Sequence, residues 1–368
     1  MNTIQNKRIE LQEQAANTLY QKHRLLCQWA TGVGKSGVVL RFLSKHPQMN
    51  CLILVPESNN IANWLTEFDK FGVSTLNVTI ICYASLHKYN NTSWDLLVFD
   101  EAPHVDTEKR KKICSSISGT YILALGAVID KEELFALEST YGYFQKSYVT
   151  LKQAITYNIL PSPIIHICHI KLDDKIHCFP YKGSLLTAEK MYAILQKNVS
   201  DAVTIYNSSS TQWNKQRMLR AGNARKKFLG QLKENVVKSI CSSLETSGKR
   251  FLCFCSSIKQ AESLNKRHAF TSKTPASFDL LNKFNNHKID SLYVVGKLIE
   301  GQNLVDVEEG IITQLGATSR ITVQSIGRIM RSKKPIIWIP VFNDTKDDSF
   351  LYTLTSNIPD TYIKHHNL

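Results

Sequence analysis

The segment 29–36, Trp-Ala-Thr-Gly-Val-Gly-Lys-Ser, is the part of the chain best suited to chemistry, and it follows an apolar run. Gly32 and Gly34 lack a Cβ, so the backbone can turn tightly and aim its N–H groups, with the start of the next helix, at phosphate oxygens. Lys35 adds a positive charge, and Ser36 adds a hydroxyl that can bind Mg²⁺. The broader phosphate-loop pattern has a glycine where this chain has Trp29, so the match is to the shorter form Ala-Thr-Gly-x-Gly-Lys-Ser. The predicted phosphate-binding residues are Thr31, Gly32, Val33, Gly34, Lys35 and Ser36.

A carboxylate pair, Asp100 and Glu101, ends a second apolar run. Such a run predicts a buried parallel strand, and the ligands of α/β sheets collect at the carboxyl ends of their strands. Asp100 would hold Mg²⁺ through its water shell, while Glu101 would polarise an attacking water molecule. An isolated Asp-Glu pair is more often a solvated loop or the start of a helix. Because a phosphate loop lies upstream, the Asp-Glu pair is here more typical of an ATPase site than of a solvated loop.

Composition points to an intracellular enzyme with a polyanionic partner. The 368 residues carry a formal net charge of +14, which favours association with nucleic acid. Residues 1–160 contain 16 basic and 14 acidic residues, so nearly all of the excess lies in the remainder. The nine cysteines are scattered, with no Cys-x-x-Cys, and no apolar run approaches the ~18 residues of a membrane span. We expect a soluble protein of the cytoplasm, without membrane contact.

Hydrophobic periodicity predicts two α/β halves, with a boundary at the prolines of 160–163. A helical stripe at 61–71, which includes Trp64, Leu65, Phe68 and Phe71, is expected to be core and to end at Gly72. The predicted domains are 1–160 and 161–368. The expected strands are 25–30, 51–55, 78–83, 96–100 and 121–128 in the first half, and 164–170, 251–255, 291–295, 310–314 and 336–342 in the second.

A basic helical segment, 185–244, is expected at the start of the second half. Trp213 lies near its basic residues, which are Lys215, Arg217, Arg220, Arg225, Lys226, Lys227, Lys233 and Lys238. The segment is either a contact surface for a phosphate backbone or a solvated helix face, and the sequence favours neither.

A third cluster, Gln-Ser-Ile-Gly-Arg-Ile-Met-Arg at 324–331, places Arg328 and Arg331 three residues apart and hence on one face of a helix. Arginines delivered across a cleft stabilise the charge on a transferring phosphoryl group. Gly327 would allow the close approach that this requires. Taken alone, the block is more typical of an ordinary surface arginine pair.

These blocks, in this order, resemble the DEAD/DEAH-type helicases and translocases of superfamily 2, in the branch of restriction-enzyme motor subunits and DNA repair helicases. Segment 29–36 is similar to motif I, Asp100-Glu101-Ala102-Pro103-His104 to a DEAH-type motif II, and 324–331 to motif VI. Segments 54–57 with Trp64, 83–86, 254–257 and 298–304 are similar to motifs Ia, Ib, IV and V. The likeness extends over nearly the whole chain.

The resemblance implies two tandem RecA-like doubly wound parallel-sheet domains that bind Mg-ATP in the cleft between them. Lys35, Asp100, Glu101, Arg328 and Arg331 would be catalytic, with Ser36 and Asp100 at the metal. Gln12 would read adenine, and Gly301 and Gln324 would also face the nucleotide. The implied nucleic-acid contacts are Pro56, Glu57, Tyr83, Ser85, Ser256 and Lys297, to which the basic segment adds Arg225, Lys226 and Lys227.

One departure bears on function. Segment 123–128 stands where motif III carries hydroxyl side chains, but Gly126 and Val128 have none, and Asp130 lies just beyond. That motif is associated in the family with coupling hydrolysis to strand separation, so ATPase activity is better supported than unwinding.

We therefore expect an ATP-dependent helicase or translocase with DNA, rather than RNA, as its partner. The alternatives are an RNA helicase, or a nucleic-acid-dependent ATPase that serves as a clamp or annealing module without unwinding. A small-molecule kinase would not explain the block at 324–331. The oligomeric state stays open and is compatible with a monomer. The compact organisation would suit a viral or mobile-element replication protein, which would act in the host cytoplasm.

Overall fold

The computed structural model describes residues 3–102, 115–271, 277–295, 304, 306–315, 326–330, 332–356 and 358–368. They form two compact units: the described residues up to Ser162, with 304 and 326–330, make up the first, and the other described residues from Pro163 onward make up the second. Residues 326–330 belong to the first unit, although the sequence assigned the arginine block to the second half. The reason is local packing, because Gly327 lies directly against Thr31 of the first unit. Among the described residues, no helix is both long enough and apolar enough to cross a membrane.

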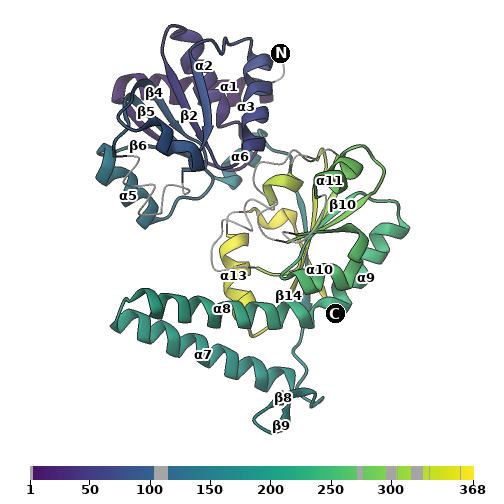
Figure 1. Ribbon diagram of the computed structural model, residues 1–368. Coiled ribbons are helices and arrows are strands. Elements are labelled where there is room, and N and C mark those ends of the chain that lie inside the picture. The colour runs from purple at the N-terminus through teal and green to yellow at the C-terminus, as the bar shows by residue number, and fades with distance from the viewer. Residues whose placement is uncertain are drawn as a thin grey trace. The chain divides into compact units, whose positions relative to one another are not determined.

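The first unit is built on a six-stranded parallel sheet with the order β3-β2-β4-β5-β1-β6 (Figure 1). Its strands are β1 (Arg24–Trp29), β2 (Cys51–Val55), β3 (Val78–Cys82), β4 (Ser93–Phe99), β5 (Ser118–Gly126) and β6 (Gln145–Val149). The first five were predicted from their apolar runs and are confirmed. β6 was not predicted, because only Val149 of its five residues is buried.

Helices connect these strands. They are α1 (Thr3–Lys22), α2 (Ser36–Lys45), α3 (Ser58–Phe71), α5 (Lys131–Tyr141) and α6 (Leu151–Thr156), with the 3-10 helix η1 (Tyr83–Tyr89). α3 ends where predicted, since Gly72 adopts the left-handed φ of 63° that a residue with a Cβ disfavours. The core prediction for its stripe was partly wrong. Trp64 and Phe68 are buried, but Leu65 and Phe71 are 47% and 40% exposed.

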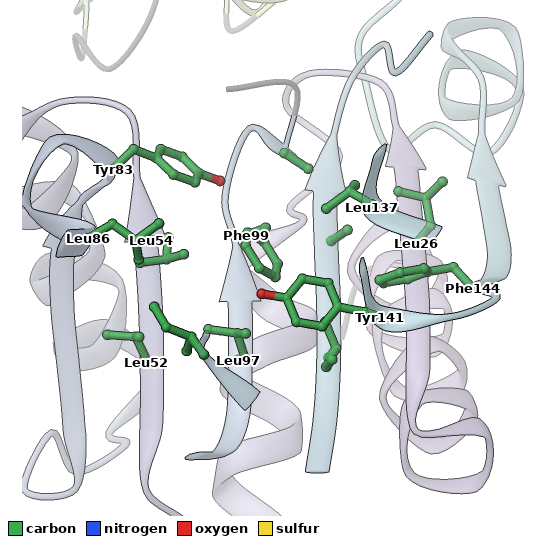
Figure 2. Close-up of a cluster of buried hydrophobic side chains, with 14 of the residues drawn as sticks. Leu26, Leu52, Leu54, Tyr83, Leu86, Leu97, Phe99, Leu137, Tyr141 and Phe144 are labelled. Atoms are coloured by element: carbon green, nitrogen blue, oxygen red, sulfur yellow. The ribbon is translucent and has the colours of Figure 1, made fainter. Parts of the chain in front are cut away.

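One face of the first sheet carries a buried apolar cluster (Figure 2). Leu52 and Leu54 of β2 pack beside Leu97 and Phe99 of β4, and α5 and η1 cover them. This burial holds β2 and β4 side by side, so that the turns that follow them lie at the same edge of the sheet.

The second unit contains a seven-stranded parallel sheet with the order β11-β12-β10-β13-β14-β7-β15. Its strands are β7 (Ile164–Ile170), β10 (Phe251–Phe254), β11 (Ala269–Phe270), β12 (Ser291–Val294), β13 (Glu309–Ile312), β14 (Ile336–Phe342) and β15 (Ile363–Asn367). The five predicted strands are confirmed, whereas the two edge strands β11 and β15 were missed. A separate hairpin pairs β8 (Phe179–Tyr181) with β9 (Ser184–Leu186).

The predicted helical segment is confirmed as a long antiparallel hairpin of α7 (Ala188–Ser208) and α8 (Gln212–Leu232), followed by α9 (Glu234–Thr246) (Figure 1). Thr187 and Thr211 cap α7 and α8, each accepting a hydrogen bond from the main-chain N–H three residues on. The other helices of this unit are α10 (Ile258–Asn265), α11 (Ser277–Asn285) and α13 (Lys346–Thr355), with 3-10 turns η3 (Lys266–His268) and η5 (Asp360–Tyr362).

Candidate nucleotide-binding site

The phosphate loop joins β1 to α2 at the carboxyl edge of the first sheet. Gly32 and Gly34 adopt φ values of 90° and 97°, which residues with a Cβ rarely reach. Within the described part of the chain, the main-chain N–H groups of Gly34, Lys35 and Ser36 donate to no other residue. α2 begins at Ser36, so these N–H groups and the positive end of the helix dipole provide an anion site.

Trp29, which departs from the broader loop pattern, is a core residue. It is fully buried at the end of β1, and its indole Nε1 donates to Ser147 Oγ of β6 over 3.0 Å. Its carbonyl oxygen accepts from Lys35 Nζ at 3.2 Å. The tryptophan thus fixes the start of the loop, and the tight turns are made by Gly32 and Gly34.

Gln12 supports the phosphate loop from behind. Its Nε2 donates to the Gly34 carbonyl over 2.8 Å, and its Oε1 accepts from Arg41 Nε at 3.0 Å. A Cβ on Gly37 would lie 2.2 Å from Gln12 Nε2, so Gly37 makes room for this contact. With 3% of its surface exposed, Gln12 is a buried support of the loop. A direct contact with adenine stays a prediction.

Arg8 was not singled out from the sequence. Its NH2 donates to the Ile159 carbonyl over 2.9 Å, and its Cδ lies 3.5 Å from where a Cβ on Gly34 would stand. Burial lowers the pKa of its guanidinium. No motif marks it, because only the fold of α1 onto the loop brings it there.

Asp100 follows β4, two strands from β1 across β5. Phe99 pairs with Ala124 of β5 and Gln28 of β1 pairs with Gly126, so the three strands end at nearly the same level. Burial and the charge of Glu101 raise the pKa of Asp100 to about 6, while a hydrogen bond from Trp64 and the positive charge of Lys35 oppose that rise. Asp100 and Lys35 therefore interact electrostatically, as the site requires.

Two donors hold Asp100 in place. Trp64 Nε1 donates to its carboxylate Oδ2 over 2.8 Å, and the Tyr83 hydroxyl donates to its carbonyl oxygen over 3.0 Å. Glu101, the next residue, has the left-handed φ of 48°, a strained value for a residue with a Cβ. Neither tertiary hydrogen bond could be predicted from the motif.

The arginine block reaches the phosphate loop within the first unit. A Cβ on Gly327 would stand 2.3 Å from Thr31 Cβ, so only glycine fits at this contact. Thr31 Oγ1 is buried there with no hydrogen-bond partner among the described residues. Arg328 is adjacent to Gly327 and is half-buried. Other predicted residues lie outside the described residues: Pro103, His104, Lys297, Gly301, Gln324 and Arg331.

The donors fit the predicted Mg²⁺. Ser36 offers a hydroxyl at the start of α2 and Asp100 a carboxylate at the end of β4, both oxygen ligands of the kind that a hard cation prefers. Among the described residues, no group of three or more His, Cys, Asp or Glu side chains could hold a metal ion. A magnesium ion here would accordingly take its remaining ligands from water and phosphate.

The segment that departs from motif III is also placed. Gly126 is the last residue of β5, and Val128 follows it with no polar side chain. Asp130 accepts a hydrogen bond from the Glu133 N–H and forms a capping box at the start of α5. Its carboxylate is thereby committed to the helix.

The predicted nucleic-acid contacts in the first unit divide into two groups. Pro56 and Glu57 are partly exposed immediately before α3, and Ser85 is partly exposed in η1. Tyr83 was a wrong prediction as a surface contact, because only 2% of it is exposed and its hydroxyl is used by Asp100.

In the second unit, the prediction for Arg225 is wrong, whereas Ser256 stays a prediction as a nucleic-acid contact. Arg225 is 8% exposed, and its NH1 donates to Gln196 Oε1 of α7 over 2.6 Å, so its charge faces the inside of the hairpin. Ser256 has its hydroxyl bonded to Gln260 Oε1 at 2.9 Å and packs under Gly230.

Three exposed cations of α8, Arg217, Arg220 and Lys227, form the α8 basic stripe with Trp213 at its start. All four side chains are exposed, and their spacing puts them on one side of the helix. Arg217 Cζ stands 5.9 Å from the Trp213 ring centroid, a cation–π contact. Lys226 is only partly exposed beside this stripe.

Lys233, counted with the basic residues, is completely buried. Its Nζ lies 2.6 Å from Asp347 Oδ2, which is equally buried, and donates to Gln314 Oε1 over 3.0 Å. Burial lowers the pKa of this lysine, and the carboxylate of Asp347 opposes that shift. It is an internal ion pair of the second unit.

Comparison with solved structures relates the chain to the helicase domain of Pyrococcus furiosus Hef, with a TM-score of 0.54 and 11% identity over 92% of this chain and 97% of that one. The chain has a helicase-like fold. At this identity the likeness is one of fold alone, and it confirms the two tandem RecA-like domains. A weaker likeness, with a TM-score of 0.39 and 14% identity over 96% of this chain and 91% of the other, relates it to the Sulfolobus solfataricus SWI2/SNF2 ATPase core in complex with double-stranded DNA. No family model and no curated protein matches the sequence.

Proposed function

We propose that this chain is a nucleic-acid-stimulated ATPase that couples hydrolysis of Mg-ATP to movement along DNA or its unwinding. The observation that carries the proposal is the contact between Gly327 and Thr31. Residues almost 300 positions apart in the sequence meet at the phosphate loop, and Arg328 stands beside that contact. A phosphate loop alone would support phosphate binding, whereas an arginine block packed against it supports phosphoryl transfer.

The residues have separate roles in this proposal. The N–H groups of the loop and Lys35 bind the phosphates, and Ser36 with Asp100 would hold Mg²⁺, which neutralises charge on the β- and γ-phosphates when bound. Glu101 orients the attacking water and accepts its proton. Arg328 stabilises the negative charge of the transition state, with Arg331 as the second expected arginine.

Two nucleic-acid contacts are proposed, one in each unit: Pro56, Glu57 and Ser85 in the first unit, and the α8 basic stripe in the second. A row of cations with an exposed tryptophan suits a phosphate backbone and a stacked base. Because DNA and RNA share that chemistry, the stripe does not choose between them. An RNA helicase therefore stays the first alternative, and an ATPase clamp that does not unwind is the second, since Gly126 and Val128 lack hydroxyls.

The decisive experiment replaces Glu101 with Gln. This variant should bind ATP and DNA with near wild-type affinity, while its hydrolysis rate falls by about 100-fold or more, because general-base catalysis typically contributes about 100- to 10,000-fold. Glu67→Gln, which removes a carboxylate of α3 paired with Lys70, is the matched control and should hydrolyse ATP normally. Near-normal turnover of Glu101→Gln would refute the assignment.

Wild-type ATPase activity with single-stranded DNA, duplex DNA and RNA at one fixed salt concentration then separates the alternatives. The proposal expects the greater stimulation by DNA. Strand displacement on a forked duplex distinguishes a helicase, which needs ATP for it, from a clamp, which hydrolyses ATP without displacing a strand.

A further inference from the structure

Asp100 receives hydrogen bonds from two segments that are not part of the phosphate loop. Trp64 Nε1 reaches its carboxylate at 2.8 Å, and the Tyr83 hydroxyl reaches its carbonyl at 3.0 Å. The two donors are 4% and 2% exposed, so water does not replace either bond freely. Both ends of the aspartate, its side chain and its main chain, are thereby tied to neighbouring elements.

The donors come from the segments that border the proposed nucleic-acid contact of the first unit. Trp64 lies on α3, which begins directly after Pro56 and Glu57, and Tyr83 is the first residue of η1, which contains Ser85. α3 follows β2, which pairs with β4, and η1 follows β3, which pairs with the other side of β2. The strands are parallel, so the turns after them lie at the same edge of the sheet as Asp100. Figure 2 shows Tyr83 with its hydroxyl directed toward the turn after β4.

The hydrogen bond from Tyr83 ends at the main-chain carbonyl that directly precedes Glu101. The Asp100 carbonyl belongs to the peptide unit that leads into Glu101, whose φ of 48° is strained. A shift of η1 would therefore move the main chain that orients Glu101, while a shift of α3 would move the carboxylate of Asp100. On the other side, β5 ends at Gly126, which has no side chain to donate to Asp100.

We infer that Trp64 and Tyr83 are positioning residues: a nucleic-acid strand bound at the start of α3 and at η1 uses their hydrogen bonds to set Asp100 and Glu101 for hydrolysis. The inference rests on the proposed function, and it explains how nucleic acid regulates the ATP site. The two bonds act in place of a hydroxyl at the end of β5.

The experiment measures the stimulation factor, defined as kcat with saturating single-stranded DNA divided by kcat without it. Trp64→Phe keeps an aromatic ring but removes the N–H, and it should lower the factor about tenfold, the equivalent of about 1.4 kcal/mol. Tyr83→Phe removes only a hydroxyl on a neutral acceptor and should lower the factor about fivefold. The KM for ATP and the Kd for the DNA should each change less than about twofold, since neither residue is expected to contact those ligands.

Matched controls are Trp94→Phe, which removes an indole donor bonded to Thr92 near the start of β4, and Tyr89→Phe, which removes a hydroxyl from the other end of η1. Both should keep the wild-type factor. The inference is wrong if Trp64→Phe and Tyr83→Phe keep it too, or if basal and stimulated rates fall equally as the melting temperature falls. A wild-type chain that DNA, RNA and duplex all fail to stimulate would instead refute the proposed function.

Discussion

Asp100→Asn should make the protein more stable at neutral pH while abolishing hydrolysis. Burial and Glu101 raise the pKa of Asp100 from 3.8 to about 6. The folded state therefore binds more protons than the unfolded state between these two values, and this carboxyl group makes folding less favourable as the pH rises from about 4 to about 7. An asparagine can still accept the Trp64 hydrogen bond but carries no charge, so it removes this pH-dependent cost.

The size of the effect follows from the shift. A pKa change of 2.2 units corresponds to about 3 kcal/mol at pH 7 and to about 0.6 kcal/mol at pH 4, which lies close to the pKa of the unfolded carboxyl. Asp100 keeps part of its surface in contact with water, which screens the charge. We therefore expect Asp100→Asn to raise the free energy of unfolding by about 1–2 kcal/mol more at pH 7 than at pH 4.

Urea denaturation of the wild type and the variant, at several pH values from 4 to 8 and without nucleotide, measures this difference. Asp95→Asn provides a control, because Asp95 lies at the other end of the same strand, where its carboxylate accepts from the Asn50 N–H. An equal change in unfolding free energy for Asp100→Asn at pH 4 and pH 7, or a loss at pH 7, would refute the reasoning that burial raises this pKa.

Two further substitutions test the packing that holds the site and the second unit. Gly327→Ala should lower kcat about 100-fold in a steady-state ATPase assay, with little change in melting temperature, because the new Cβ would force the arginine block away from the phosphate loop. The control is Gly222→Ala, where a Cβ meets nothing within 4 Å. This variant should hydrolyse ATP normally in the same assay. Lys233→Met should cost about 3–5 kcal/mol of unfolding free energy in urea, because it leaves Asp347 buried without its cation, and adding Asp347→Leu should recover most of that loss. Lys227→Met, on the exposed side of α8, should change stability by less than about 0.5 kcal/mol, and a comparable loss there would contradict the role of burial.

The strands that the sequence predicts are those with their own apolar runs. β2, for example, is apolar and buried at all five positions, so its composition alone predicts a buried strand. β15, Ile-Lys-His-His-Asn, has no such run, and it is held by main-chain pairing to β7 and by two histidine pairs, His166 with His366 and His169 with His365. A strand whose partners are 200 residues away carries no local signal of its own.

The same distinction separates the predicted from the missed parts of the site. The turns at Gly32 and Gly34 follow from local backbone chemistry, and Asp100 follows from a strand that ends in a carboxylate. The helical pattern predicts Trp64 as part of a core stripe. That prediction is correct for the ring, which is buried, but it says nothing about the indole N–H. That group meets Asp100 only after α3 packs against β2 and β3, so a helical pattern could not reveal the bond.

The cations of α8 differ in burial, which a count of basic residues in the sequence does not reveal. Arg225 and Lys227 stand two positions apart in a run of cations, but a helix turns by about 200° over two residues, so they cannot share a face. Arg225 falls with Phe228 and Leu229 on the buried side, whereas Lys227 falls with Arg217 and Arg220 on the exposed side. Within α8, the helical phase therefore separates Arg217, Arg220 and Lys227 from the buried Arg225. The α8 basic stripe is suited to following one phosphate backbone along the helix.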